Sequence, residues 1–358
     1  MATMEYPRIS KNINKIESVL QDQTSVLLFN ARLHYSITRD KKQFYKAVDT
    51  VEKNWICPEL ERFLEKTQGE GIIVWGCGHD GKETKRVLDL CGHPPAFFCD
   101  RDTDKVGSRV EGVEVISFDS LVKKYSHYSV VIGSGAYKRE MYRDLVSNNF
   151  PEQNILNPRY NHLQARTEKK QYFDVFKPDE NEIFVDVGAY LGETIWDFVQ
   201  WTDRNYLKII AMEPSEERCR HIAASCKERG LKNVYVKAFA AWEKEDRLFF
   251  KEDKAGSRVE QNKQDNGNVV KAIDMDNIIQ NDPVTFIKMD IEGGELKALK
   301  GAGMVIKRER PKLAISLYHK PEDIIELPLY LLELVPEYKF YIRHYRSDIC
   351  ETVLYAYV

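Results

Sequence analysis

Short apolar runs alternate with amphipathic segments twice along the chain, in residues 71–160 and again in residues 172–358. In the first series, "GIIVWG", "PAFFCD", "VEVISFD" and "YSVVIGSG" are typical of buried strands. The segments "KETKRVLDLCG" and "YKREMYRDLVSN" between them have the pattern of helices. Strands that alternate with helices favour parallel β-α-β units. We therefore predict an α/β protein with two Rossmann-like domains in tandem.

The second series is longer and ends differently. Its expected strands are "IFVDVG", "LKIIAMEP", "NVYVKAF", "TFIKMD", "LAISLY", "FYIRHY" and "TVLYAY". Only a few polar residues separate the last two, so we predict that these two strands pair in antiparallel fashion.

The changes of pattern predict four parts of the chain. Residues 1–70 form a helical segment that we expect to cover the next domain, and residues 71–160 form the first Rossmann-like domain. The polar run at residues 161–171 is the expected linker, and residues 172–358 form the second domain.

Composition excludes several classes of protein. The chain has 358 residues, a formal net charge of −3 and a pI of about 6.3, so it lacks the basic excess that nucleic-acid binding requires. No apolar run of membrane-spanning length or signal-like start is present, and no C-x-x-C pair occurs among the 7 cysteines. We expect a cytoplasmic protein without a membrane span; the sequence leaves its oligomeric state, including a homo-oligomer, open.

The stretch "FVDVGAYLGET" at the start of the second domain has the features of a ligand-binding turn. In open α/β sheets, ligands bind at the carboxyl ends of the strands. Gly188 and Gly192 bracket the turn after the first strand, and glycine allows a ligand to lie against the backbone. Asp186 ends that strand, and Glu213 ends the next one, where an acid can accept hydrogen bonds from ribose hydroxyls.

This turn lacks the closely spaced G-x-G of dinucleotide-binding folds, so no pyrophosphate need cross the helix N-terminus. A ligand with adenosine at one end and a charged amino acid at the other suits Asp186 and Glu213 better. S-adenosylmethionine is such a ligand.

The segments "FVDVGAYLGET", "AMEPSEE", "FIKMDIEGGELKALKGA" and the closing "LAISLYHKPEDIIELPLYLLE" resemble the FkbM family of S-adenosylmethionine-dependent methyltransferases. The resemblance covers about residues 172–358. It implies a seven-stranded class I methyltransferase sheet and methyl transfer to a hydroxyl of a sugar, glycan or related small-molecule acceptor. The implied cofactor contacts are Asp186, Gly188, Tyr190, Gly192, Glu213, Pro214, Ala241 and Trp242.

Charged residues gather where the fourth and fifth strands of this domain should end. Lys288, Asp290 and Glu292 crowd the first of these ends, and His319 follows "LAISLY" at the next. Buried charges must be paired, bound to metal or directed into a cleft. We predict that His319 takes the proton of the acceptor hydroxyl while Asp290 positions the site, with Lys288 and Glu292 in support. A divalent metal ion is the alternative, and the sequence leaves the choice open.

The first domain has a G-x-G-x-x-G turn of its own. Gly76, Gly78 and Gly81 follow a strand and precede a helix, and Asp100 ends the next strand. NAD is one candidate ligand. The run "FFCDRDTDKVGSRVEGVEVISFDSL" resembles the nucleotide-sugar-binding domain of bacterial sugar acyltransferases, which implies a nucleotide or nucleotide-sugar ligand. A domain that has kept the fold and lost the ligand is equally open.

The polar stretch "KEDKAGSRVEQNKQDNGN" is long for a connection between strands. We expect it to form a mobile flap over the acceptor, with Ser257 and Arg258 as substrate contacts.

These features favour an O-methyltransferase of polysaccharide or natural-product biosynthesis. A nucleotide-sugar-binding scaffold with a vestigial methyltransferase domain is the alternative, and a nicotinamide-dependent oxidoreductase ranks last.

Overall fold

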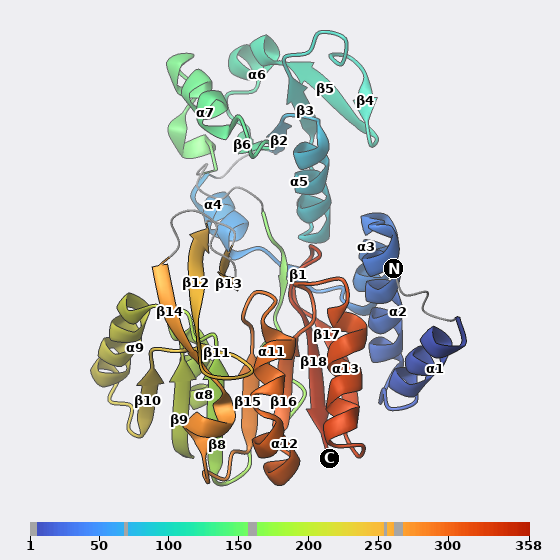
Figure 1. The fold of residues 1–358 in the computed structure, drawn as a ribbon. Helices are drawn as coiled ribbons and strands as arrows, with labels where there is room; N and C mark the ends of the chain where they lie inside the picture. Colours follow the sequence, from blue (N-terminus) through green and yellow to red (C-terminus); the bar gives the residue numbers. More distant parts are fainter. Residues whose placement is uncertain (1–5, 68–70, 157–162, 254–255, 261–267) are drawn as a thin grey trace. The chain divides into compact units, whose positions relative to one another are not determined.

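The computed structural model describes residues 6–67, 71–156, 163–253, 256–260 and 268–358 (Figure 1). The chain forms two compact units. The larger unit consists of Met1–Val48, Lys169–Tyr345 and Ile349–Val358, and the smaller unit consists of Asp49–Glu168 and Arg346–Asp348.

A seven-stranded sheet of order β10-β9-β8-β15-β16-β18-β17 is the centre of the larger unit. Its strands are parallel except for β18, which pairs in antiparallel fashion with both β16 and β17. The strands span Glu182–Val187 (β8), Tyr206–Met212 (β9), Val234–Lys237 (β10), Phe286–Met289 (β15), Lys312–Ser316 (β16), Lys339–His344 (β17) and Thr352–Tyr357 (β18). The prediction of a seven-stranded α/β sheet with an antiparallel end is confirmed.

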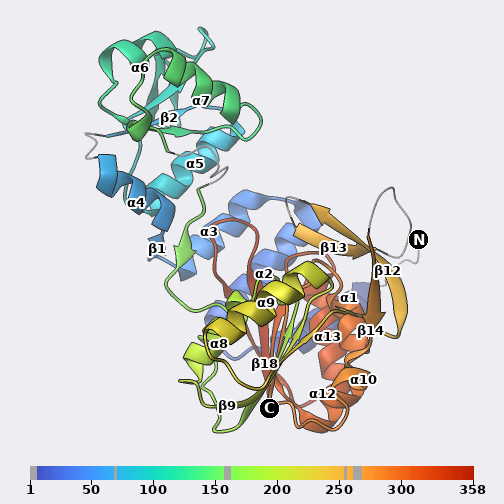
Figure 2. The same ribbon diagram turned by 90° about the vertical axis from the view of Figure 1, so that its left-hand side faces the viewer.

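Helices cover both faces of this sheet (Figure 2). One face carries α8 and α9, and the other carries α11, α12 and α13. Their bounds are Glu193–Trp201 (α8), Glu216–Glu228 (α9), Glu295–Lys300 (α11), Gly303–Glu309 (α12) and Asp323–Leu334 (α13), with the short α10 at Met275–Ile279. Six strands of this sheet therefore contribute wholly buried apolar side chains, among them Phe184, Phe286 and Tyr355. These strands are β8, β9, β15, β16, β17 and β18.

Within the predicted helical segment, the helix at Pro58–Thr67 belongs to the smaller unit, which follows it in sequence, as expected. The three helices before it belong instead to the larger unit, except for the last residues of the third, from Asp49 on. They are α1 (Tyr6–Glu17), α2 (Gln23–Thr38) and α3 (Lys41–Val51). Arg343 on β17 pairs with Asp22, the N-cap of α2, with 2.6 Å between Nη2 and Oδ2. The hydroxyl of Ser25 accepts a hydrogen bond from the backbone of Ile342 at 2.9 Å. Helix α2 thus covers the edge strand of the seven-stranded sheet.

A second sheet of order β11-β14-β12-β13 includes residues 251–253, 256–260 and 268 of the stretch in which we expected a flap. The rest of that stretch, residues 254–255 and 261–267, lies outside the described residues. Its strands are Ala240–Ala241 (β11), Asp246–Asp253 (β12), Gly256–Glu260 (β13) and Asn268–Ile273 (β14). Strand β12 pairs in antiparallel fashion with both β13 and β14. Ala240, Trp242, Leu248 and Ala272 form its small apolar core. An antiparallel sheet can have one polar face, which explains why these strands do not stand out as apolar runs.

The smaller unit contains a five-stranded sheet of order β4-β5-β3-β2-β6, as predicted for a Rossmann-like domain. Strand β2 lies between β3 and β6 and is parallel to both. The strands are Ile72–Trp75 (β2), Phe97–Asp100 (β3), Arg109–Val110 (β4), Val113–Ser117 (β5) and Ser129–Ile132 (β6). Its helices are Pro58–Thr67 (α4), His79–Leu90 (α5), Phe118–Lys124 (α6) and Lys138–Ser147 (α7), with a 3-10 turn at Glu152–Asn154. A two-stranded sheet joins Trp55–Ile56 (β1) to Arg166–Thr167 (β7).

Candidate active site

The acidic and basic residues singled out in the second domain follow neighbouring parallel strands. Asp186 lies near the end of β8, Glu213 follows β9, Asp290 follows β15 and His319 lies beyond β16. Because these four strands are parallel, their carboxyl ends meet at one edge of the sheet. Ligands of open α/β sheets bind at this edge.

Asp186 and Lys288 form a buried ion pair between β8 and β15. The Asp186 Oδ1 atom lies 3.0 Å from the Lys288 Nζ atom, which also donates to the carbonyl oxygen of Gly188 at 2.8 Å. Burial raises the pKa of Asp186, and the ammonium group of Lys288 opposes this effect. Lys288 therefore holds the first strand end, instead of supporting Asp290 as predicted.

Glu213 is held by the backbone on two sides. Its Oε2 atom accepts a hydrogen bond from the amide of Tyr190 at 3.1 Å, and its Oε1 atom accepts one from Ser215 at 3.0 Å. Arg218 lies 3.6 Å from Oε1. Burial raises the pKa of Glu213, while the two amides and Arg218 favour the charged form. Each carboxylate oxygen retains a second lone pair that can accept a hydrogen bond from a ligand hydroxyl group.

Backbone contacts explain both glycines of the first turn. Gly188 has a φ of +81°, and an added Cβ would lie 2.1 Å from the carbonyl oxygen of Asp290. Gly192 has a φ of +88° and is the N-cap of α8. The close passage of the β8 and β15 strand ends is therefore sufficient to explain Gly188, and ligand approach at this turn stays a prediction.

The other predicted cofactor contacts occupy different environments. Tyr190 is 53% exposed, and the Arg218 guanidinium lies 4.6 Å from its ring centroid. Pro214 is half-buried directly after Glu213. Ala241 and Trp242 are buried in the second sheet, and the Trp242 indole nitrogen has no hydrogen-bond partner among the described residues.

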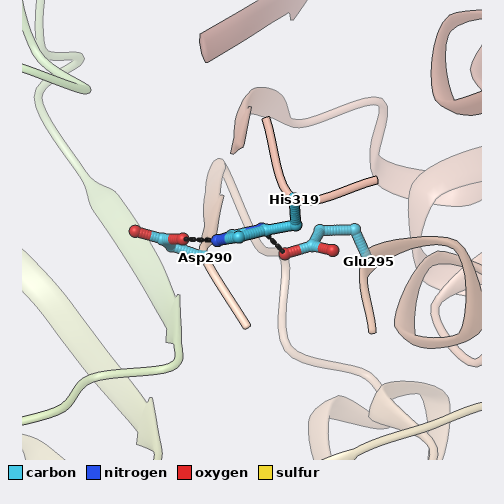
Figure 3. Close-up of side chains that lie close together, drawn as sticks. All are labelled: Asp290, Glu295 and His319. Carbon is cyan, nitrogen blue, oxygen red and sulfur yellow. Dashed lines mark hydrogen bonds and ion pairs between the residues drawn. The ribbon is translucent and has the colours of Figure 1, made fainter. Parts of the chain in front are cut away.

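His319 lies between acidic groups (Figure 3). Its Nδ1 atom is 2.9 Å from Oε1 of Glu295, and its Nε2 atom is 3.4 Å from Oδ1 of Asp290. The Oε2 atom of Glu292 also lies 3.4 Å from Nε2. Glu295 is wholly buried, and its Oε1 atom accepts a further hydrogen bond from the amide of Ile291 at 2.9 Å. Three carboxylates thus face one imidazole ring.

These carboxylates change the protonation of His319. Burial lowers the pKa of the imidazole, but the hydrogen bond and charge of Glu295, with Asp290 and Glu292, raise it to about 9. The ring is therefore charged at neutral pH in the absence of ligands. A charged imidazole cannot accept a proton, so this value counts against the predicted role of His319 as general base.

Two tyrosine hydroxyls hold Asp290. Tyr172 donates to Oδ2 at 2.8 Å, and Tyr318 donates to Oδ1 at 3.3 Å. Burial and the charge of Asp290 raise the pKa of both tyrosines, which therefore act as donors at neutral pH. Sequence reasoning missed both residues: Tyr318 adjoins His319, but Tyr172 precedes the first strand and belongs to no motif.

The predicted nucleotide turn of the smaller unit is in part a packing feature. A Cβ added to Gly81 would lie 1.9 Å from the carbonyl oxygen of Gly76, and one added to Gly76 would lie 2.9 Å from that of Gly133. An added Cβ at Gly78 would meet nothing within 4 Å. Only Gly78 therefore has open space beside its backbone.

Asp100 lies beside this turn at the end of β3. Its Oδ2 atom accepts hydrogen bonds from the amide and the thiol of Cys77, at 3.2 and 3.0 Å. Burial would raise the pKa of Asp100, but the hydrogen bonds from Cys77 and Asp102 and the charge of Lys105 lower it. Asp100 thus has the strand-end position predicted for it, with its carboxylate charged.

Three further observations concern the predicted flap, a cavity and membrane spans. Ser257 and Arg258 lie on β13, but their side chains are outside the described part of the structure. A cavity of about 450 Å³ lies near the starts of β15 and β16, lined by Thr285 and Lys312 among others, away from the residues above. No helix in the described ranges is long and apolar enough to cross a membrane.

Comparison with known proteins identifies one domain. Residues 186–341 match the family described as Methyltransferase FkbM domain. The structure of a methyltransferase FkbM from Methylobacillus flagellatus KT aligns with 94% of this chain and 99% of its own, with a TM-score of 0.51 and 19% identity. The likeness in fold therefore extends over nearly the whole chain.

Two further structures align with about half of the chain. An rRNA methylase from Streptococcus thermophilus covers 50% of this chain and 87% of its own, with a TM-score of 0.34 and 14% identity. Fibrillarin from Aeropyrum pernix, in complex with S-adenosyl-L-methionine, covers 51% and 68%, with a TM-score of 0.33 and 11% identity. Among curated proteins, none matches the sequence.

Proposed function

Taking residues 186–341 as an S-adenosylmethionine-dependent methyltransferase domain of the FkbM type, we propose that the protein methylates a hydroxyl group of a sugar, glycan or related acceptor. The observation that carries the proposal is the row of functional groups at one sheet edge. Asp186 and Glu213 lie at the ends of β8 and β9. Asp290 and His319 follow β15 and β16, which lie on the other side of β8 from β9. The first pair suits a cofactor and the second an acceptor.

The residues present fit the cofactor. The Oδ2 atom of Asp186 is buried and has no hydrogen-bond partner among the described residues, so it can accept a bond from a ligand ammonium group, directly or through water. The free lone pairs of Glu213 suit the two ribose hydroxyls. Pro214 and Tyr190 would flank the ribose, with Gly188 and Gly192 shaping the turn below it, and Ala241 and Trp242 on the adenine side. When bound, S-adenosylmethionine supplies an electrophilic methyl group.

Asp290 is the residue that we propose to receive the acceptor. Its side chain is 22% exposed and can be reached from solvent, whereas its partner Tyr172 is buried. Each oxygen accepts one tyrosine hydroxyl and retains a lone pair for the acceptor hydroxyl. The two tyrosines fix the carboxylate, so that it can orient the hydroxyl and take its proton as the methyl group is transferred.

We assign His319 a role different from the one its position in the sequence suggested. As an imidazolium it compensates the charges of Asp290, Glu292 and Glu295, which would otherwise repel one another. The positive ring thus holds the three carboxylates together around the acceptor position.

The smaller unit we propose to be a nucleotide or nucleotide-sugar site that presents the acceptor. The open space beside Gly78 and the charged Asp100 at the end of β3 support this proposal. The packing roles of Gly76 and Gly81 mean that these glycines add nothing to it.

Label transfer tests the reaction. The protein is incubated with S-adenosylmethionine carrying a labelled methyl group and with free sugars, oligosaccharides and nucleotide sugars. We expect label in a product that resists alkaline hydrolysis, because a methyl ether is stable to base and a methyl ester is not. Label confined to base-labile or amine products would contradict hydroxyl methylation.

A further inference from the structure

We infer that His319, Asp290 and Glu292 form a binding site for a divalent transition-metal ion, with His319 Nε2, Asp290 Oδ1 and Glu292 Oε2 as its protein ligands. The catalytic use of the ion rests on the proposed function, whereas binding of the ion needs neither cofactor nor acceptor. We choose Mn²⁺ as the test ion, because imidazole and carboxylate together suit a transition metal better than Mg²⁺.

Both separations from the ring nitrogen of His319 fit this arrangement. Nε2 lies 3.4 Å from Oδ1 of Asp290 and 3.4 Å from Oε2 of Glu292. Ligands that are about 2.0–2.2 Å from a common metal ion, at angles between right and tetrahedral, lie roughly 3.0–3.5 Å apart. The contacts are too long for strong hydrogen bonds, for which about 2.7–3.2 Å is usual.

The buried imidazole supplies an independent observation. The His319 side chain is 7% exposed, and its Nε2 atom has no hydrogen-bond partner in the described part of the chain. This nitrogen points toward Asp290 (Figure 3). Asp290, Glu295 and His319 each offer a ligand atom within 4.8 Å of the others. Glu292 is not part of that group, and its place beside it rests on the 3.4 Å separation between its Oε2 atom and Nε2 of His319. A buried ring nitrogen that faces carboxylates and makes no hydrogen bond is available as a metal ligand.

The residues behind the ligands have the arrangement that metal sites use. Glu295 Oε1 lies 2.9 Å from His319 Nδ1, so a proton on Nδ1 leaves the lone pair of Nε2 for the ion. Tyr172 and Tyr318 donate to Asp290 and fix its orientation. Lys288 is occupied by Asp186 and does not neutralise Asp290. The three carboxylates therefore gather negative charge around one imidazole ring, and a divalent cation would balance it.

An ion in this position would serve the proposed reaction. It would bind the acceptor oxygen and lower the pKa of the hydroxyl, which is the ordinary effect of a metal ion on bound water or alcohol, and the hydroxyl proton would leave to solvent water. Asp290 would then act as a ligand, and the ion would replace its direct contact with the hydroxyl.

Manganese binding tests the inference. The full chain is freed of metal with EDTA, and Mn²⁺ is titrated at pH 8 while the electron paramagnetic resonance signal of free Mn²⁺ is followed. We expect one site per chain. Glu292→Gln, which changes a 38% exposed side chain and should fold normally, is expected to weaken binding about tenfold or more, as is the orienting variant Glu295→Gln. Asp282→Asn, which removes a carboxylate paired with Lys208 elsewhere on the sheet, is the matched control and should bind as the wild type does.

The outcomes separate this inference from the proposed function. Absence of a Mn²⁺ site in the wild type, or equal affinity in Glu292→Gln, Glu295→Gln and the control, would overturn the metal site. Binding of S-adenosylhomocysteine is measured by calorimetry on the same samples. A protein that binds the cofactor product but not Mn²⁺ supports the methyltransferase site alone, and the reverse result supports the metal site alone.

Discussion

The Asp186 carboxylate and the Lys288 ammonium group form an ion pair across β8 and β15, with 3.0 Å between Oδ1 and Nζ. Both side chains are nearly inaccessible to solvent, with 0% and 3% of their surfaces exposed. Asp186 belongs to the proposed cofactor site, and Lys288 lies on β15, the strand directly before Asp290. Its loss should therefore affect stability and cofactor binding together.

Lys288→Met should destabilise the protein strongly, because it leaves the Asp186 charge buried without its partner. We expect the free energy of unfolding to fall by about 3–5 kcal/mol. The matched control is Lys208→Met, which breaks a pair whose side chains are both 29% exposed and should cost about 0–1 kcal/mol. Denaturant unfolding of both variants measures the difference. Equal losses would mean that burial of the Asp186–Lys288 pair has no special weight.

Gly188→Ala should lower the free energy of unfolding more than Gly230→Ala does, although both glycines have a positive φ. Gly230 has a φ of +65° and open space around it, so Gly230→Ala should cost about 1–2 kcal/mol from the backbone alone. Gly188→Ala adds a contact of 2.1 Å with the Asp290 carbonyl, which should cost about 1–3 kcal/mol more. Thermal unfolding compares the two. Similar losses would show that the strand ends can separate without penalty.

The state of His319 should make stability depend on pH. Its folded-state pKa of about 9 exceeds the ordinary value of 6.5, so the stabilisation is complete below pH 6.5 and is lost as the pH rises through 9. The shift corresponds to a loss on the order of 3 kcal/mol. His319→Gln should lack this dependence. Because burial raises the pKa of the neighbouring Asp323 to about 7, the range above pH 7.5 reports mainly on His319. An imidazole that titrates below pH 7 by NMR would refute this assignment.

The sequence predicted the fold and the candidate site to different extents. The two series of strands follow from local apolar runs, and the parallel pairing follows from the helices between them. The second sheet was missed because the strands of a small, largely antiparallel sheet need not form long apolar runs. The N-terminal helices were assigned to the wrong neighbour, since their contact with β17 joins residues such as Asp22 and Arg343 at opposite ends of the chain.

The strand-end acids were found because each follows a recognisable strand. Their partners were not, because pairing depends on register and on distant segments. Lys288 pairs with Asp186, its neighbour across the parallel strands, and not with the nearby Asp290. Glu295, at the start of α11, was not among the predicted site residues, yet it is buried against His319. Tyr172 reaches Asp290 from a segment without any motif.

Gly78→Val should separate ligand binding from folding in the smaller unit. An added Cβ at Gly78 meets nothing within 4 Å, but Gly78 is the N-cap of α5, where valine is disfavoured. The free energy of unfolding of the variant should therefore lie within about 1 kcal/mol of that of the wild type. Gly81→Val, in contact with the Gly76 carbonyl, should be clearly destabilised and serves as the comparison. If the unit binds a nucleotide sugar, a UDP-sugar should raise the melting temperature of the wild type and leave that of Gly78→Val unchanged. No shift in the wild type at saturating UDP-sugar would count against this site.

The crystal structure of the protein with bound S-adenosylhomocysteine tests the central claim most directly. We expect the two ribose hydroxyls within hydrogen-bonding distance of Glu213, about 2.6–3.2 Å, and the amino group on the Asp186 side. The sulfur atom should face the edge formed by Asp290 and His319, with room for an acceptor between them. A ligand bound away from Glu213, or a sulfur atom directed away from Asp290 and His319, would contradict the account.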